Sequence, residues 1–512
     1  MSPRDHTKKD APAVTEASGS TSATETVAPR TLEEVVSIFK SSLFLPDPTI
    51  LYVVAGAVAA NQLDGDPVWL LVVGPPSSGK TEVLSSMSGL ENVHPAATLT
   101  EGALLSGTAQ KDHAHDAKGG LLREIGEYGI VLAKDFGSVL SMNKDTRAAM
   151  LAGLREIYDG SWTRRVGVDG GRKLHWEGKL GLIGGCTPAI DRHHAVIAAM
   201  GDRFVLFRIG GRVEDETSKQ KRSKQLIRRA LLGSGDEKQL RRKLSEAVAG
   251  LFAGIEGREP RDITDDEIEF LSALAILVVR CRSAVERDGQ SREIAAVPQS
   301  ELPARVVKQL ERLLAGLDVI GLDRDMALRV IAKVALDNMP AVRLNVIAAL
   351  YELGDGAATT QIAEKTGLPS TATRRALEDL TAHGVINREP QGQGMADLWH
   401  LASWARASYA LATEALEGEL DLTFPEMSGG AQRESSREAT AEPQDPKCSY
   451  PVRAPTDFSG TPPNGSNTTV PYRESSNGST PQPVPEGWNQ AEQEALLDEA
   501  LRQWRGPDGS GA

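Results

Sequence analysis

One stretch, PVWLLVVGPPSSGKTEVLSSM (residues 67–87), limits the fold more than any other part of this 512-residue chain. An all-apolar run leads into a loop of Gly, Pro and Ser, and a helical pattern follows. A strand that is apolar at every position is buried on both faces, as in a parallel sheet covered by helices. The order strand, loop, helix therefore predicts an α/β fold. Later apolar runs, GIVLAKD, KLGLIGGCTP and DRFVLFRI, supply further strands of the same kind.

The loop of this unit, GPPSSGKT, fits the pattern G-x-x-x-x-G-K-[ST] in the strand-to-helix context that gives the pattern meaning. Its glycines let backbone N–H groups and the helix N-terminus face a phosphate chain. Lys80 supplies a charge for the outer phosphates, and the Thr81 hydroxyl is a ligand for Mg²⁺. The predicted cofactors are ATP and Mg²⁺, and the predicted binding residues are Gly74, Pro75, Pro76, Ser77, Ser78, Gly79, Lys80 and Thr81.

The run GIVLAKDFGSVLS places Asp135 at the end of a buried strand, where a carboxylate can hold Mg²⁺ together with Thr81. Hydrolysis also needs a group that orients or deprotonates water, and Phe136, the next residue, cannot do this. Three acids are candidates for that role, although each also fits a solvated helix or loop position: Glu101, Glu124 and Glu127.

Two polar residues at other strand ends are also candidates for catalysis. Thr187 follows the strand GLIGGC and could contact the γ-phosphate or its water. Arg203 begins the strand in DRFVLFRI, from which it could neutralise charge on a nucleotide held by a neighbouring subunit. A salt bridge between Arg203 and Asp202 or another nearby acid is the alternative.

From Val342 to His400 the pattern changes to three helices followed by an extended pair, VINRE and ADLWHL, which is typical of a winged helix-turn-helix. Its predicted recognition helix, STATRRALEDL, offers side chains to a DNA major groove, and Arg388 with the QGQG wing could contact phosphate. Such modules also dock on proteins, so both partners stay open. The groove-facing residues we expect are Ser370, Thr371, Thr373 and Arg374.

Composition and pattern divide the chain into five regions. Both ends are rich in Pro, Ser, Gly and charge without periodicity, so we expect disorder there. The tail from residue 414 has 7 basic and 17 acidic side chains and supplies most of the net charge of -13, so the folded part is near neutral. The regions are 1–30, disordered; 31–213, nucleotide-binding core; 214–340, helical lid; 341–410, winged helix-turn-helix; and 411–512, an acidic tail with a short terminal helix.

The order of these motifs resembles the AAA+ P-loop ATPases of the clade with a β-hairpin before sensor 1, which includes the minichromosome-maintenance helicases. The resemblance covers residues 35–338. It implies a ring-shaped homo-oligomer with these roles: Walker A, Gly74, Gly79, Lys80 and Thr81; Walker B, Asp135; sensor 1, Thr187; arginine finger, Arg203; sensor 2, Arg305 in SELPARVVKQLERLLAGL. This chain departs from the family in having Phe136 in place of Glu and Thr187 in place of Asn.

The hairpin of that clade contacts nucleic acid, and WTRRVGVDGGRKLHWEG is the matching segment here, with Asp-Gly-Gly at its turn. Its cations could neutralise DNA phosphates, or they could only discourage edge-to-edge aggregation. They are Arg164, Arg165, Arg172 and Lys173.

Several function classes are excluded or disfavoured. Cys186, Cys281 and Cys448 lie far apart, which argues against a disulfide framework and fits a reducing cytoplasm. The most apolar stretches fall short of the roughly 20 residues that span a bilayer, and no secretion leader is apparent. His113 and His115 form an H-x-H pair that nothing nearby completes as a metal site. The terminal helix, with Leu497, Leu501 and Trp504 on one face, could dock on a partner protein.

Together these features predict an ATPase that acts as a DNA-associated motor or remodeller of the helicase or replication-initiator type, such as the initiator of a mobile genetic element. The alternative is an ATP-gated, DNA-binding transcriptional regulator with weak or no hydrolysis. The missing acid after Asp135 favours the alternative, because a switch needs little turnover.

Overall fold

A computed structural model describes residues 27–43, 45, 47–107, 118–167, 171–193, 203–210, 237–354 and 356–418, with 220, 221, 223, 224, 227 and 420. The chain divides into two units, Met1–Ser428 and Gly429–Ala512, and all described residues belong to the first. The predictions for residues 1–26, for His113 and His115, for the hairpin turn at 168–170 and for the terminal helix lie outside the described residues.

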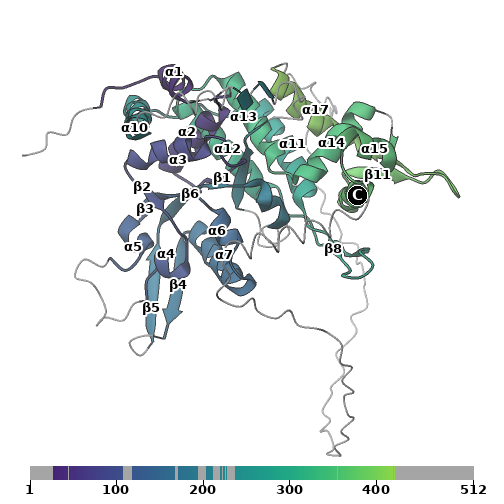
Figure 1. Ribbon diagram of the computed structural model, residues 1–512, viewed down its shortest axis with the longest axis horizontal. Coiled ribbons are helices and arrows are strands. Elements are labelled where there is room, and N and C mark those ends of the chain that lie inside the picture. The colour runs from purple at the N-terminus through teal and green to yellow at the C-terminus, as the bar shows by residue number, and fades with distance from the viewer. Residues whose placement is uncertain are drawn as a thin grey trace, which may run out of the picture. The chain divides into compact units, whose positions relative to one another are not determined.

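A five-stranded sheet forms the centre of the first unit, and every strand pairing in it is parallel, as predicted (Figure 1). Its order along the sheet is β2 (Val93–Ala96), β3 (Tyr128–Ala133), β6 (Lys179–Cys186), β1 (Trp69–Val73) and β7 (Phe204–Arg208). Because all the strands run the same way, the loops that follow them meet at one edge of the sheet, which we call the carboxyl edge.

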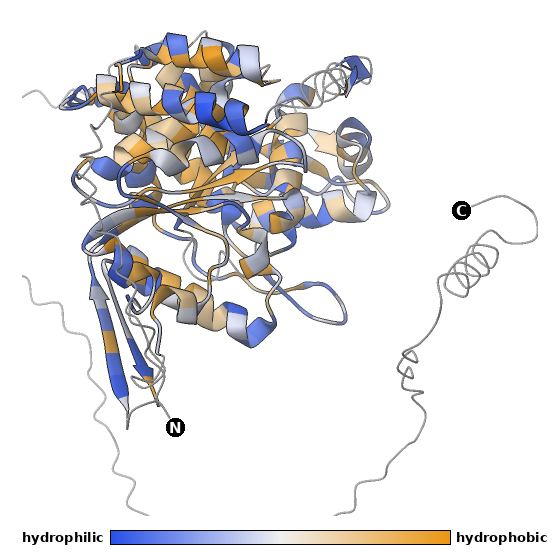
Figure 2. Cartoon of the chain, turned by 60° about the vertical axis from the view of Figure 1, so that its left-hand side comes forward, coloured by the Kyte–Doolittle hydropathy of each residue, from blue (hydrophilic) through white to orange (hydrophobic). Residues whose placement is uncertain are grey.

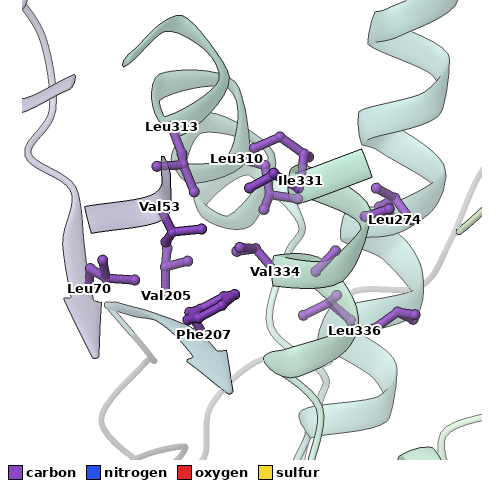
Figure 3. Packing of buried hydrophobic residues seen from close by; sticks show 14 of the residues in the cluster. Val53, Leu70, Val205, Phe207, Leu274, Leu310, Leu313, Ile331, Val334 and Leu336 are labelled. Carbon is purple, nitrogen blue, oxygen red and sulfur yellow. The ribbon is translucent and has the colours of Figure 1, made fainter. Parts of the chain in front are cut away.

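The strands bury both faces, since successive side chains point to opposite sides. Leu70 and Val72 belong to one core with α2 (Thr49–Gln62), α3 (Lys80–Ser86) and the helices of the lid. Figure 3 shows Leu70, Val205 and Phe207 of the sheet facing lid residues such as Leu310 and Val334. Trp69, Leu71 and Val73 belong to a second core on the other face.

The second core includes α6 (Gly137–Leu140) and α7 (Lys144–Tyr158), together with a hairpin of β4 (Ser161–Val166) and β5 (Arg172–Glu177). These two strands pair antiparallel, as predicted, with Trp162 opposite Trp176. Short helices α4 (Glu101–Leu104) and α5 (Leu121–Ile125) bury Leu104 and Leu122 in the same core. Figure 2 shows that hydrophobic residues concentrate in the sheet and in the helices that cover it.

In the part of the predicted helical lid described from residue 237 on, the helices are α10 (Glu237–Gly254), α11 (Asp265–Arg282), α12 (Ala304–Val319) and α13 (Arg324–Asp337). A small hairpin of β8 (Glu286–Arg287) and β9 (Ile294–Ala296) interrupts it, which the sequence did not indicate. α12 crosses α2 so closely that a Cβ on Gly316 would lie 2.0 Å from the Gly56 carbonyl oxygen. Only glycine permits this approach, which brings α12 of the lid directly against α2.

At the start of the fold, α1 (Leu32–Ser42) begins with a capping box. The Glu34 amide donates to the Thr31 hydroxyl, and the Thr31 amide donates to the Glu34 carboxylate. No described helix is long and apolar enough to cross a membrane.

The region after the lid combines helices with a three-stranded antiparallel sheet of order β10, β12, β11. It extends past the boundary predicted at residue 410, because Tyr409, Ala412 and Ala415 are buried and continue the last helix to Glu417. Its elements are α14 (Ala341–Leu353), β10 (Ala357–Ala358), α15 (Thr359–Thr366), α16 (Ser370–Ala382), β11 (Ile386–Glu389), β12 (Leu398–Leu401) and α17 (Ser403–Glu417).

Candidate functional site

The loops after β1, β3 and β6 are tied together at the carboxyl edge. The Gly74 amide donates to the Cys186 carbonyl oxygen at 3.1 Å, and the Phe136 amide donates to the Gly185 carbonyl oxygen at 2.8 Å. Lys80, Asp135 and Thr187, which follow these three strands, therefore lie at the same edge, as the sequence predicts. Asp135 and Thr187 are both exposed to solvent there.

The loop from Gly74 to Lys80 has a backbone that few residues tolerate. Gly79 has φ 82° and Ser77 has φ 63°, so the chain turns through the left-handed region twice. The Lys80 ammonium donates to the carbonyl oxygens of Gly74 (3.0 Å) and Pro75 (2.9 Å). A Cβ on Gly74 would lie 3.0 Å from the Ser78 hydroxyl and 3.1 Å from the Ile209 side chain. The loop is thus wrapped around the lysine at the start of α3.

The charges at this edge influence one another. Burial lowers the pKa of Lys80, while Cys186 and Asp135 oppose that shift. Burial also raises the pKa of the Cys186 thiol to about 12, so the thiol is neutral at physiological pH. Lys80 lowers and Asp135 raises the pKa of Cys186, the last residue of β6.

The donor groups at this edge fit Mg²⁺. Asp135 Oδ1 accepts a hydrogen bond from the Gly137 amide at 2.9 Å, which orients its exposed carboxylate. The exposed Thr81 is the second residue of α3. Carboxylate and hydroxyl oxygens suit Mg²⁺, which keeps several waters and binds substrate phosphates. Among the described residues, no group of three or more His, Cys, Asp or Glu forms an all-protein metal site, so Asp135 and Thr81 would hold the ion together with phosphate and water.

Phe136 belongs to the core rather than to the site. Its side chain is fully buried and packs against Phe204. None of the three candidate acids has a described contact with the loop. Glu101 lies 3.5 Å from Arg164 of the hairpin, and Glu124 lies 3.6 Å from Lys118.

Glu127 is at the opposite edge of the sheet from Lys80. It precedes β3, and its carbonyl oxygen accepts a hydrogen bond at 2.8 Å from the amide of Lys179, the first residue of β6. Within one chain, Glu127 therefore cannot activate water at the carboxyl edge.

Arg203 and Arg305 also lie at this opposite edge. The Arg203 guanidinium is 11% exposed and contacts the Asp159 carboxylate at 2.7 Å. Arg305 Nη1 donates to Glu301 at 2.8 Å. Asp159, Glu301 and Arg305 line a cavity of about 770 Å³, and Gln309, another lining residue, donates to the Arg203 carbonyl oxygen at 2.7 Å. The two arginines thus come together, but within one chain they do not join Lys80.

Two charged residues at the carboxyl edge were not predicted from the sequence. Arg208, the last residue of β7, donates from both terminal nitrogens to the Asp191 carboxylate, at 2.7 and 3.0 Å. Both residues influence the pKa of Cys186 at the end of β6: Arg208 lowers it and Asp191 raises it. Arg208 ends an apolar strand just as Asp135 does, so the same rule applied to FVLFR could have found it.

The hairpin cations divide according to strand alternation. Arg165 and Lys173 are exposed and lie directly opposite each other. Arg164 and Arg172 lie on the other face with Trp162 and Trp176. Arg164 donates to the Leu105 carbonyl oxygen at 2.9 Å, so it supports the hairpin rather than facing solvent.

One residue of the predicted recognition helix is misassigned. Thr373 is fully buried, and its hydroxyl donates to the Pro369 carbonyl oxygen at 3.2 Å, so it cannot contact a groove. Ser370, Thr371 and Arg374 on α16 are exposed. Arg374 donates to Glu378 at 3.0 Å. The wing residue Arg388 donates to Asp397 at 2.7 Å.

Comparison with known proteins gives limited matches. The FaeA-like protein family matches residues 343–403. No curated protein matches the sequence significantly. Among solved structures, a Cytophaga hutchinsonii protein assigned provisionally as an ATPase has 12% identity, a TM-score of 0.32, and covers 60% of this chain and 85% of its own. The C-terminal region of NrS-1 has 11% identity, a TM-score of 0.26, and covers 74% and 78%. These likenesses are too distant to transfer an activity, so the function is inferred from the site's own residues.

Proposed function

We propose that the chain binds ATP with Mg²⁺ at the carboxyl edge of the sheet and hydrolyses it slowly. The observation that supports this most is the convergence of the wrapped loop, Lys80 and Asp135 at one edge. Phosphate oxygens would replace the Gly74 and Pro75 carbonyl oxygens as partners of the Lys80 ammonium. Asp135 and Thr81 would hold Mg²⁺, which neutralises charge on the phosphates when bound, and Thr187 would contact the outer phosphate.

We further propose that the protein is a DNA-associated motor or remodeller that works as a ring of identical subunits. In a ring, Arg203 and Arg305 of one subunit could act on the nucleotide of the next. Because both lie at the edge opposite Lys80, any action on a nucleotide would be on that of a neighbouring subunit; the Arg203–Asp159 ion pair is the structural alternative. Arg203 would first have to release Asp159, because its guanidinium is nearly buried against that carboxylate.

DNA contacts in this proposal come from two places. Arg165 and Lys173 on the exposed face of the hairpin would neutralise phosphates. Residues 341–410 would form a winged helix-turn-helix, with Ser370, Thr371 and Arg374 on its recognition helix α16. The order helix, strand, helix, helix and two-stranded wing supports this proposal.

The test is ATP binding and turnover by the full-length protein, with and without single- and double-stranded DNA. Lys80→Ala should abolish binding, whereas Lys238→Ala, which removes an exposed lysine from α10, should not. Equal binding by the two variants would overturn the nucleotide-site proposal. If neither DNA nor oligomer assembly changes the rate of ATP turnover, the motor proposal is overturned.

One observation favours a second function, an ATP-gated transcriptional regulator. Phe136 is a core residue, so the position after Asp135 supplies no acid to activate water, and turnover is expected to be slow. A footprint at one specific DNA sequence that ATP strengthens, even when Asp135→Asn blocks hydrolysis, would select the regulator. Unwinding of a forked duplex would select the motor.

A further inference from the structure

Arg208 and Asp191 form a bridge across the base of the phosphate-binding loop. β1 lies between β6 and β7, and its last residue, Val73, pairs with Cys186 on one side and Arg208 on the other. Asp191 belongs to the short helix η4 (Pro188–His193), which follows β6. The two-pronged ion pair between Arg208 and Asp191 therefore crosses the end of β1, where the loop begins.

The same arginine is attached to the lid. Its amide donates to the Asp337 carboxylate at 2.7 Å, and its Nε donates to the Asp337 carbonyl oxygen at 2.9 Å. The Lys333 ammonium completes the contact by donating to the Arg208 carbonyl oxygen at 2.9 Å and to the Asp337 carboxylate at 2.8 Å. Lys333 and Asp337 both belong to α13, and Asp337 is buried.

The residue after Arg208 contacts the loop directly. The Ile209 amide donates to the Val73 carbonyl oxygen at 2.8 Å, and its side chain packs closely enough that a Cβ on Gly74 would lie only 3.1 Å from it. A movement of the loop is therefore transmitted to Arg208 through packed side-chain atoms and through the hydrogen bonds of its guanidinium. Arginine suits this task because its planar group holds two partners in fixed directions, which a lysine cannot do.

We propose that Arg208 is a positioning residue that couples occupancy of the loop to the packing of α13, so that ATP binding tightens the lid. This inference rests on the proposed nucleotide site. When phosphate draws Lys80 away from the Gly74 and Pro75 carbonyl oxygens, the loop changes shape beside the bridge. Arg208 passes that change to Asp337 and Lys333, and thus to the lid helix.

The experiment measures two quantities on the full-length protein: affinity for a fluorescent ATP analogue with Mg²⁺, and amide hydrogen exchange of α13 with and without ATP. In the wild type, ATP should slow exchange in residues 324–337 by about threefold or more. Arg208→Lys should bind the analogue within about threefold of wild type and lose that protection. Arg388→Lys, which alters another arginine–carboxylate pair on the wing, should keep the protection.

Asp191→Asn tests the coupling from the other side of β1 and decides the question alone if Arg208→Lys does not fold. It should also abolish the ATP-dependent protection, and the double variant should lose no more than either single one, because both variants break the same ion pair. The coupling would be overturned if Arg208→Lys or Asp191→Asn binds the analogue normally and keeps the protection. It would also be overturned if bound ATP leaves hydrogen exchange in α13 of the wild type unchanged. Absence of ATP binding by the wild type would instead overturn the nucleotide site.

Discussion

The ring of Phe136 packs against the ring of Phe204, with centroids 5.0 Å apart and planes inclined by 59°. Phe204 in turn lies 5.2 Å from Trp69 at the start of β1, which makes Phe136 part of an aromatic cluster under the sheet. The position after Asp135 thus stabilises the fold, and the carboxylate one residue earlier faces solvent.

Phe136→Ala should lower the free energy of unfolding by about 3–5 kcal/mol, because it leaves a cavity in a packed core. Chemical denaturation would measure the loss. Phe252→Ala is the matched control, because Phe252 on α10 is only partly buried and should cost less. Equal losses in the two variants would contradict the structural role of Phe136.

Phe136→Glu should not create a faster ATPase. The new carboxylate would be buried among Phe204 and other apolar groups, where an unpaired charge is strongly unfavourable. The variant should therefore unfold more readily and show no gain in turnover per molecule of folded protein. A stable Phe136→Glu protein with raised turnover would refute this.

Glu127→Gln should leave ATP turnover within about twofold of wild type, because the residue lies at the edge away from Lys80. Asp135→Asn is the comparison and should lower turnover by at least about tenfold, since it removes the carboxylate proposed to hold Mg²⁺. Steady-state phosphate release measures both. A collapse of turnover in Glu127→Gln would mean that this acid acts on a neighbouring subunit's nucleotide.

Local patterns predicted the parallel sheet, the wrapped loop and the edge shared by Lys80, Asp135 and Thr187. Each of these follows from a few consecutive residues: an all-apolar strand, a glycine-bearing loop, or a polar residue at a strand end. Positions set by the packing of distant segments were harder to predict. The approach of α12 to the start of the sheet places Arg305 beside Asp159 and away from the loop, and no local pattern encodes that.

Side-chain direction was the second limit. Thr373 is a polar residue, yet its spacing from Ala376, Leu377 and Leu380 places it on the buried face of α16. Four basic residues of the hairpin look alike in sequence, but strand alternation sends Arg165 and Lys173 to solvent and the other two to the inner face. The Arg208 bridge needed the order of the strands, because only that order places η4 and β7 on either side of β1.

The exposed face of the hairpin should account for part of any DNA affinity. The double variant Arg165→Gln with Lys173→Gln should weaken binding to all DNA sequences alike. It should also reduce the slope of log Kd against log salt concentration by about two, about one for each phosphate that is no longer neutralised. Fluorescence anisotropy over a range of salt concentrations measures this. Lys238→Gln on α10 is the control. An unchanged salt slope in the double variant would remove the hairpin from the DNA-binding surface.

His383, at the end of α16, makes the packing between the lid and residues 341–417 sensitive to acid. Its Nδ1 lies 3.0 Å from the Ser300 hydroxyl, and its Nε2 lies 3.1 Å from the Ala284 carbonyl oxygen. Burial lowers the pKa of His383 from 6.5, and the nearby Arg343 and Arg280 add to this, while the bond to Ala284 and the charge of Asp379 oppose it. The unfolded chain therefore binds the proton more readily than the folded one.

It follows that the stability contributed by the neutral His383 ring is complete above pH 6.5 and is lost as the pH falls from there toward the folded-state pKa. Wild type should thus lose more unfolding free energy between about pH 7.5 and about pH 5.5 than His383→Gln, whose amide has no charge to gain. Denaturant titrations at both pH values measure the difference. His400→Gln is the control, because His400 contacts Glu389 at 2.8 Å on the wing. If wild type and His383→Gln lose stability equally, acid acts on this protein through other groups.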